Sequence, residues 1–149
     1  MSVHPESPVS TVMSWPVATI DHEATLAEAA EFLAADNIGV LLVLRDGALA
    51  GLISERDVVA HVAMGTDLSH LLVGEAMAGE LVTVAPEATI ASAARTMDEC
   101  DVRHLPVLQG ELMAGMVSVR DLLPILAASD APLDPVILPA GTRVLLRTE

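Results

Sequence analysis

The sequence carries one pattern of residues twice, at a constant offset of 64 positions. Repetition at a fixed offset indicates a duplicated supersecondary unit, so the chain is expected to fold as two similar halves. Two halves related by a pseudo-two-fold axis place equivalent polar residues around a shared cleft. The matches pair Met13 with Met77, Thr19 with Thr83, Val43-Leu44 with Val107-Leu108, and Ser54, Arg56 and Asp57 with Ser118, Arg120 and Asp121.

The first copy predicts a strand, a helix, two more strands and a second helix. Thr25 and Glu28 have the spacing of a capping box, which marks the start of a helix, and apolar residues follow at helical spacing. Asp46-Gly47 suits a tight hairpin, because both central residues of a type I′ turn have positive φ. We expect strands at 17–20, 40–44 and 49–53 and the second helix at 54–64.

The second copy predicts the same elements. A strand at 81–84 is followed by a helix that Thr89 opens, by paired strands at 102–108 and 112–117, and by a helix starting at Ser118. Pro124 falls inside this last helix. Since proline lacks a backbone donor, we expect a kink or an early end there.

These elements predict an α/β (α+β) fold of two β-α-β-β-α repeats related by pseudo-two-fold symmetry, with helices covering small sheets. The expected organisation is a tail at 1–8, a repeat at 9–64, a linker at 65–72, a repeat at 73–128 and a final segment at 129–149. That segment fits either an extra hairpin packed on the body or an arm that completes a dimer or docks a partner.

Composition excludes several classes of function. The net charge is −14, with seven arginines and no lysine, so no basic face is available for a nucleic-acid backbone. One Phe, one Trp and no Tyr leave few rings for stacking on bases. The longest aliphatic run, 40–44, is far too short to span a membrane. The N-terminal residues have no signal-peptide pattern and Cys100 is a single cysteine, so we expect a soluble cytoplasmic protein without disulfides.

No motif for catalysis or for a metal site is recognisable. The five histidines have no ligand spacing, and Cys100 has no histidine in a nucleophile pattern. The sequence therefore predicts a protein that is not an enzyme and that requires no cofactor.

The repeated Ser-x-Arg-Asp motif is the strongest candidate for a binding site. It follows a Gly-apolar-apolar strand end and opens a helix, where free amides and the helix dipole favour anions. The aspartate in the first turn offers two acceptor oxygens to the hydroxyls of a ribose. A purely structural interpretation is equally physical, since Ser-x-x-Asp is also a helix cap worth about 1 kcal/mol. Two copies in register favour a ligand.

The repeats resemble a pair of cystathionine β-synthase (CBS) domains, a tandem also called a Bateman module. The resemblance rests on 102–107, Val-Arg-His-Leu-Pro-Val, followed by 112–123 with its Gly-Met-Val-Ser-Val-Arg-Asp core, and it covers about 9–128. Such modules typically bind adenosine nucleotides or S-adenosylmethionine between the two repeats and form disk-like dimers.

The resemblance implies a set of binding residues. Asp57 and Asp121 would hold ribose, and Ser54 and Ser118 would meet ribose or phosphate. The remaining candidates are the motif arginines and the residues near the base and phosphate, namely Thr19, Ile38, Leu41, Arg56, Thr83, Val102, Arg103, His104, Pro106 and Arg120.

The two copies differ where phosphate would bind. The second has Arg103 and His104, whereas the first has Gly39 and Val40, with Leu42 in place of Pro106. We therefore expect at most one well-formed site for a phosphorylated nucleotide, unless the opposite repeat supplies the missing cation. The alternative for Arg103 is a solvated ion pair with Asp98, Glu99 or Asp101.

The resulting hypothesis is a non-catalytic regulatory module that binds AMP, ADP, ATP or S-adenosylmethionine and signals by a change of conformation. The expected partners are a small-molecule nucleotide, a second copy in a homodimer and a protein not yet identified. The competing hypothesis is a structural or adaptor dimer with vestigial clefts, which docks a partner through 129–149.

Overall fold

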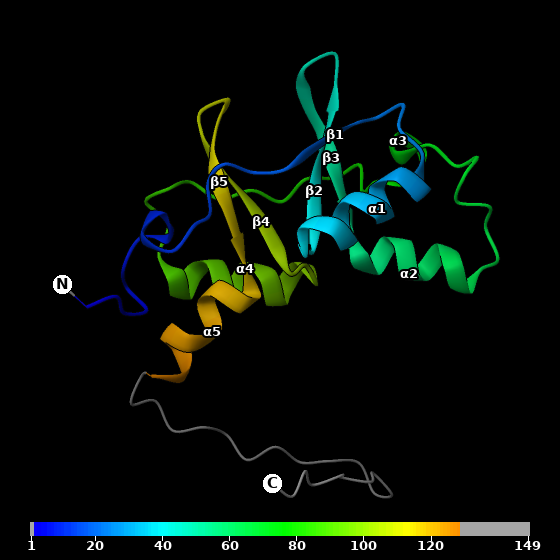
Figure 1. Ribbon diagram of the computed structural model, residues 1–149. Coiled ribbons are helices and arrows are strands. Elements are labelled where there is room, and N and C mark those ends of the chain that lie inside the picture. Colours follow the sequence, from blue (N-terminus) through cyan, green and yellow to red (C-terminus); the bar gives the residue numbers. More distant parts are fainter. Residues whose placement is uncertain (1, 129–149) are drawn as a thin grey trace, which may run out of the picture.

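The computed structural model describes residues 2–128, and the expected arm or hairpin at 129–149 lies outside the described residues. Figure 1 shows two similar halves side by side, with the hairpin tips at one end of the strands and the long helices near the other. Each half combines strands and helices in the same order. The mixed α+β fold of two repeats is therefore confirmed.

The first half contains a three-stranded sheet. β1 (Thr19–Asp21) pairs in parallel with β2 (Val40–Arg45), which pairs antiparallel with β3 (Ala48–Ser54). Asp46 and Gly47, at the β2–β3 turn, have φ of 52° and 78°, as a type I′ hairpin requires.

Two helices flank this sheet. α1 (Leu26–Asp36) begins at the predicted capping box, in which Thr25 Oγ1 accepts a hydrogen bond from the Glu28 amide at 3.2 Å. α2 (Glu55–Ala63) follows β3 without a connecting loop.

The second half repeats this order with one strand fewer. α4 (Ile90–Cys100) precedes the antiparallel pair β4 (His104–Gln109) and β5 (Leu112–Ser118), and α5 (Val119–Ala127) follows. The strand predicted at 81–84 is reduced to a single parallel bridge between Val84 and Val107.

Two prolines explain this difference. In the first half the amides of Leu42 and His22 donate to Ala18 and Leu44 across the parallel ladder. The corresponding residues of the second half are Pro106 and Pro86, which have no amide hydrogen. Only the two hydrogen bonds made by Val84, to Pro106 and from Leu108, remain.

The expected early end at Pro124 is wrong. α5 continues through Pro124 to Ala127 and has nine residues, as does α2. Pro124 is exposed at the sixth helical position, so its ring faces solvent. The capping box at Ser118 and the buried Leu122 stabilise the helix around it.

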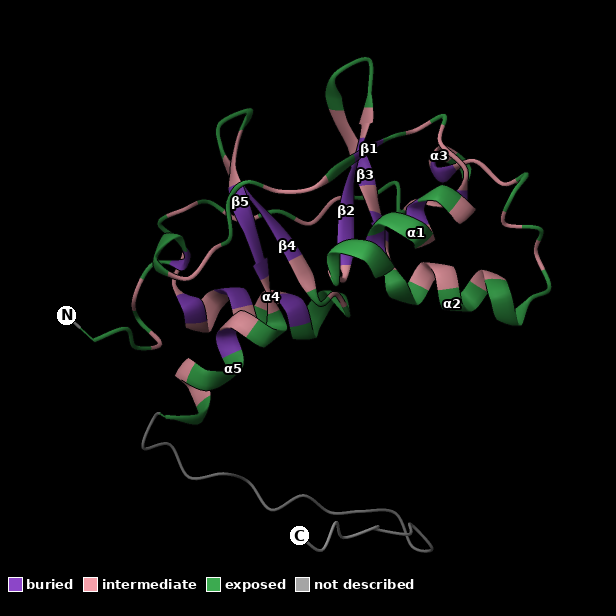
Figure 2. Cartoon of the chain, viewed as in Figure 1, coloured by how far each residue is buried: buried purple, intermediate pink, exposed green. Residues whose placement is uncertain are grey.

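Each half receives its first helical turn from the other repeat. Val9, in the 3-10 helix Val9–Thr11, is fully buried in the core of the second half, and its amide donates to Ala88 at 2.8 Å. Val73, in α3 (Val73–Ala76), is fully buried in the core of the first half, and its amide donates to Ala24 at 2.7 Å. In Figure 2, α3 lies beside the first half and has a buried stretch next to more exposed residues. The two halves are therefore interlocked.

The exchanged segments then cross the sheets at glycines. A Cβ atom at Gly51 would lie 2.7 Å from the carbonyl oxygen of Ala78, and one at Gly115 would lie 2.8 Å from that of Ser14. Ser14 and Met116 exchange two backbone hydrogen bonds of 2.8 and 3.0 Å beside this contact. The two backbones can approach this closely only because Gly51 and Gly115 have no side chain.

Replacing Gly115 by alanine should destabilise the fold by about 1–3 kcal/mol, because the new methyl group would displace the Ser14 backbone. Gly79→Ala is the matched control, since a Cβ there meets no atom within 4 Å. Urea unfolding measures both. A Gly115→Ala protein as stable as Gly79→Ala would contradict the role assigned to this contact.

Candidate functional site

The repeated Ser-x-Arg-Asp motif forms a helix cap in both halves. Asp57 Oδ2 accepts hydrogen bonds from the Ser54 amide at 2.8 Å and the Ser54 hydroxyl at 2.9 Å. Asp121 does the same with Ser118, at 2.8 and 3.0 Å. The structural interpretation of the motif is therefore realised twice. In each aspartate the second oxygen, Oδ1, has no partner among residues 2–128, so capping does not exhaust the carboxylate.

The helix starts offer fewer free amides than the sequence suggested. The amide of Glu55 donates to the carbonyl of Gly39 at 3.0 Å, and that of Val119 donates to Arg103 at 2.9 Å. At α2 the Ser54 and Asp57 amides are also taken by the cap. Of the first four amides there, only that of Arg56 has no partner in the described chain.

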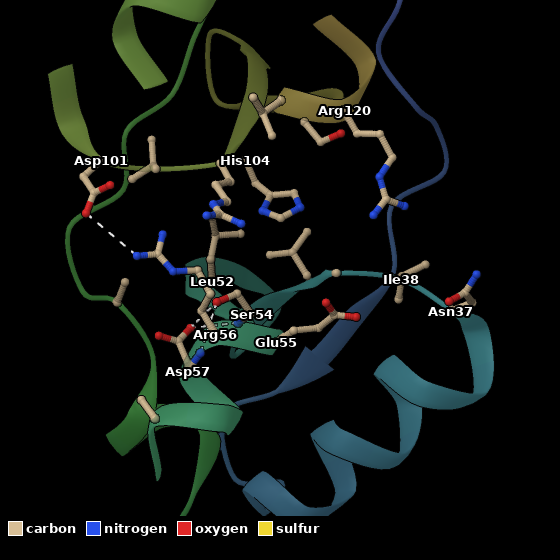
Figure 3. Close-up of a pocket in the computed structure, with 18 residues that line it drawn as sticks. Asn37, Ile38, Leu52, Ser54, Glu55, Arg56, Asp57, Asp101, His104 and Arg120 are labelled. Carbon is tan, nitrogen blue, oxygen red and sulfur yellow. Dashed lines mark hydrogen bonds and ion pairs between the residues drawn. The ribbon is translucent and has the colours of Figure 1, made fainter. Parts of the chain in front are cut away.

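A cavity of about 610 Å³ lies between the halves, at the point where α2 and α5 begin. Figure 3 shows side chains of both repeats directed into it. Nine of the predicted site residues line it, namely Ile38, Ser54, Arg56, Asp57, Val102, Arg103, His104, Ser118 and Arg120.

Five predicted residues do not line this cavity. Leu41 and Pro106 are buried in the two halves, and Thr19 and Thr83 are exposed elsewhere. Asp121 caps α5 and is not among the residues that line the cavity, although its charge acts on His104. Their roles in binding stay predictions.

Three polar residues that line the cavity were absent from the predicted set. Asn37 and Asp101 end α1 and α4 with φ of 51° and 52°, a conformation that Asn and Asp tolerate. The sequence signal that could have identified Asn37 and Asp101 is a polar residue directly after the apolar residues of each helix. Glu55, the first residue of α2, occupies the variable position of the repeated motif.

One ion pair joins the two repeats across the cavity. Arg56 lies 3.8 Å from Asp101, and both side chains are exposed, so the pair adds at most about 1 kcal/mol. Arg103 makes no ion pair with any described residue, and Asp101 pairs with Arg56 instead. The guanidinium of Arg103 is thus available to a ligand.

His104 is the half-buried group at the centre of the cavity. A Cβ atom at Gly39 would lie 3.3 Å from its Nε2, so the imidazole of one repeat packs on the backbone of the other. Burial lowers the pKa of His104, which the charges of Arg103 and Arg120 lower further. Asp121 and Glu55 oppose this shift. The neutral imidazole is therefore favoured near pH 7.

The cavity pairs chemical groups from opposite repeats. Asp57 comes from the first repeat, whereas Arg103 and Arg120, which line the same cavity, come from the second. Gly39, Arg103 and Arg120 all line this cavity, and the supply of the missing cation by the opposite repeat stays a prediction.

The comparisons with known proteins agree with this architecture. The sequence model of the CBS domain matches residues 9–64 and again 73–128. The chain belongs to the CBS domain family. CBS domain pairs are regulatory modules, and this pair is 32% identical over 117 residues to the CBS domain-containing protein YhcV of Bacillus subtilis, covering 78% of this chain and 83% of that protein.

Another relative is longer. The mitochondrial CBS domain-containing protein CBSX3 of Arabidopsis thaliana is 35% identical over 116 residues, which cover 74% of this chain but only 55% of that protein.

Solved structures show the same fold. A protein with CBS domains from Burkholderia ambifaria superposes with a TM-score of 0.77 at 25% identity, covering 85% of this chain and 98% of that one. The CBS domain pair of protein MJ0100, solved in complex with 5′-methylthioadenosine and S-adenosyl-L-methionine, superposes with a TM-score of 0.73 at 23% identity, covering 83% and 98%.

Two further observations concern only residues 2–128 of this CBS pair. None of their helices is both long and apolar enough to cross a bilayer. No three of their His, Cys, Asp and Glu side chains are grouped in a way that could hold a metal ion.

The partial burial of His104 should make the stability of the protein depend on pH. Because burial lowers its pKa, the folded chain binds this proton more weakly than the unfolded chain, whose value is near 6.5. Stability should therefore fall as the pH drops below about 6.5, and His104→Gln should lose less than wild type. Urea unfolding at about pH 7.5 and pH 5.5 measures the difference. His70→Gln, at an exposed histidine, is the control, and an equal pH dependence of wild type and His104→Gln would contradict the prediction.

Proposed function

We propose that this CBS pair is a regulatory module, without catalysis of its own, that binds an adenosine-type ligand in the cavity between its repeats. The candidate ligands are AMP, ADP, ATP and S-adenosylmethionine. The observation that carries the proposal is that Asp57 of the first repeat and Arg103 and Arg120 of the second line one cavity.

Asp57 supplies the acceptor for ribose. Its Oδ2 is held by the Ser54 amide and hydroxyl, which fixes the carboxylate at the start of α2. Oδ1 is left to accept from a hydroxyl group of a ligand. One residue thus caps the helix and binds, so the two interpretations of the motif do not compete.

The phosphate end is formed by the second repeat. Arg103 and Arg120 carry delocalised cations that match the geometry of phosphate oxygens. The free amide of Arg56 adds a backbone donor at the start of α2. His104 adds a ring nitrogen in the same cavity.

The remaining wall is aliphatic and suits a purine base. Its apolar residues are Ile38, Val40, Leu52, Ala60, Ala78, Val102 and Val119. The volume of about 610 Å³ lies within the range of small-molecule sites. The complex of MJ0100 with two adenosine derivatives supports the ligand class, since it has the same fold.

The cavity position suggests how binding would be transmitted. A ligand held by Asp57 and by Arg103 touches both repeats at once. Its binding energy therefore favours the arrangement of the repeats in which both contacts form, which is a shift of population. A partner that binds selectively to that arrangement would respond to the concentration of the ligand.

Asp57→Asn and Asp121→Asn form a matched pair for testing this site. Both aspartates have the same capping contacts, but only Asp57 lines the cavity. Asp57→Asn should weaken binding of AMP by about tenfold or more, since it removes a charged acceptor worth roughly 1.5 kcal/mol or more. Asp121→Asn should change it little.

Isothermal titration calorimetry measures both affinities, and unfolding curves check that both variants fold. Unchanged affinity in Asp57→Asn would refute the ribose contact. Absence of binding by all four ligands to wild type would refute the adenosine site.

We also infer that the pair forms a homodimer through its helices. Val59 on α2 is 65% exposed and Leu123, at the equivalent position of α5, is 56% exposed. Phe32 and Val62 are further exposed apolar residues on α1 and α2. Figure 2 shows extensive exposed surface along these helices. The same helical position is thus apolar and exposed in both repeats, as an interface requires.

Val59→Asp combined with Leu123→Asp should convert the dimer to a monomer, because burying two uncompensated carboxylates is costly. Light scattering after size exclusion measures the mass. Leu112→Asp is the control, since Leu112 is 74% exposed but lies on the β4–β5 hairpin. A wild-type monomer would refute the inference.

A further inference from the structure

The two repeats contribute different charged groups to the same cavity. The second repeat brings a cation and an imidazole where the first has small or apolar residues, and the first repeat brings a carboxylate where the second has valine. The second repeat also has Asp101 where the first has Asn37. Four pairs that line the cavity therefore differ in charge or polarity, namely Arg103 with Gly39, His104 with Val40, Glu55 with Val119, and Asp101 with Asn37.

Glu55 gives the first repeat a negative charge in the cavity that its counterpart Val119 does not have. It is the first residue of α2, and Figure 3 shows its carboxylate directed away from Asp57, toward the side of the cavity where Arg120 lies. Its charge raises the pKa of His104 against the lowering by burial, as the charge of Asp121 does more strongly. Glu55 lines the same cavity as Arg103 and Arg120, the residues proposed to bind phosphate.

The positive and negative charges of the side chains that line the cavity cancel. Among residues 2–128, three guanidinium groups and three carboxylates line the cavity, and the imidazole of His104 is favoured in its neutral form. One of the guanidinium groups, Arg56, already lies near Asp101. Arg103 and Arg120 can neutralise one phosphate, whereas the β- and γ-phosphates of a longer chain would meet Glu55 without further cations.

We propose that Glu55 is a specificity-determining residue that restricts the cavity to adenosine ligands with no more than one phosphate. The inference rests on the proposed function, because it assumes that an adenosine ligand binds here. The inference about Glu55 goes beyond the proposed function in one respect. AMP should bind more tightly than ADP, and ADP more tightly than ATP, because the Glu55 carboxylate repels each added phosphate.

Calorimetric titration of wild type and Glu55→Gln with AMP, ADP and ATP, in the absence of magnesium, tests the proposal. Wild type should bind AMP at least about tenfold more tightly than ATP. Glu55→Gln should strengthen ATP binding by roughly tenfold and AMP binding by less than about threefold, since a carboxylate–phosphate interaction in a partly exposed site is of this order. The wild-type preference should also shrink at high salt.

Two controls separate this effect from others. Glu111→Gln removes the same charge from the turn of the β4–β5 hairpin, and its affinities should equal those of wild type. Glu55→Val introduces the residue of the second repeat and should relax the preference as Glu55→Gln does. Thermal unfolding without ligand checks that the variants fold.

The failures of the two proposals are distinguishable. If AMP binds and the ratio of AMP to ATP affinity is the same in wild type and Glu55→Gln, the role of Glu55 is refuted while the adenosine site stands. Equal binding of AMP and ATP by wild type refutes it as well. If neither protein binds any of the three nucleotides, both proposals are refuted.

Discussion

The exchange of first turns between the repeats is the constraint on which the rest of the structure depends. Val9 completes the core of the second half and Val73 that of the first, so neither half has a complete core without the other repeat. The segments that follow cross the sheets at Gly115 and Gly51 with no room for a side chain. These contacts hold the starts of α2 and α5 on either side of one cavity, and a site built from both repeats requires that fixed spacing.

In the proposed site one motif would serve stability and binding together. Asp57 uses one carboxylate oxygen for its cap and presents the other to the cavity wall. Arg103 has two roles of the same kind. Its carbonyl accepts a hydrogen bond from the first amide of α5, and its side chain has no ion pair among residues 2–128. Because most of the amides at the start of α2 are already satisfied by the fold, the proposed site relies mainly on side chains to select its ligand.

The sequence predicted the local features well and the long-range pairings poorly. The caps at Thr25, Ser54 and Ser118 and the turn at Asp46 depend on neighbours within a few positions, and they formed as expected. The loss of the strand at 81–84 was readable from Pro86 and Pro106, once each was compared with its counterpart in the first repeat. The exchange was not readable, because a buried valine at position 9 carries no information about which core it enters. The duplication did predict a cleft lined by polar residues of both repeats, and Asp57 and Arg103 both line it.

The interlocked arrangement has a consequence for how such a molecule can diverge. A chain with one repeat alone would find a place for its first turn only on a second copy, and two such copies would rebuild this arrangement as a symmetric dimer. Joining the copies makes that association intramolecular, at high effective concentration. A symmetric dimer must carry every substitution twice, at both equivalent positions. The fused chain is free of this requirement, so it can hold glutamate at 55 and valine at 119, and an electric field across its cavity that no homodimer of single repeats could sustain.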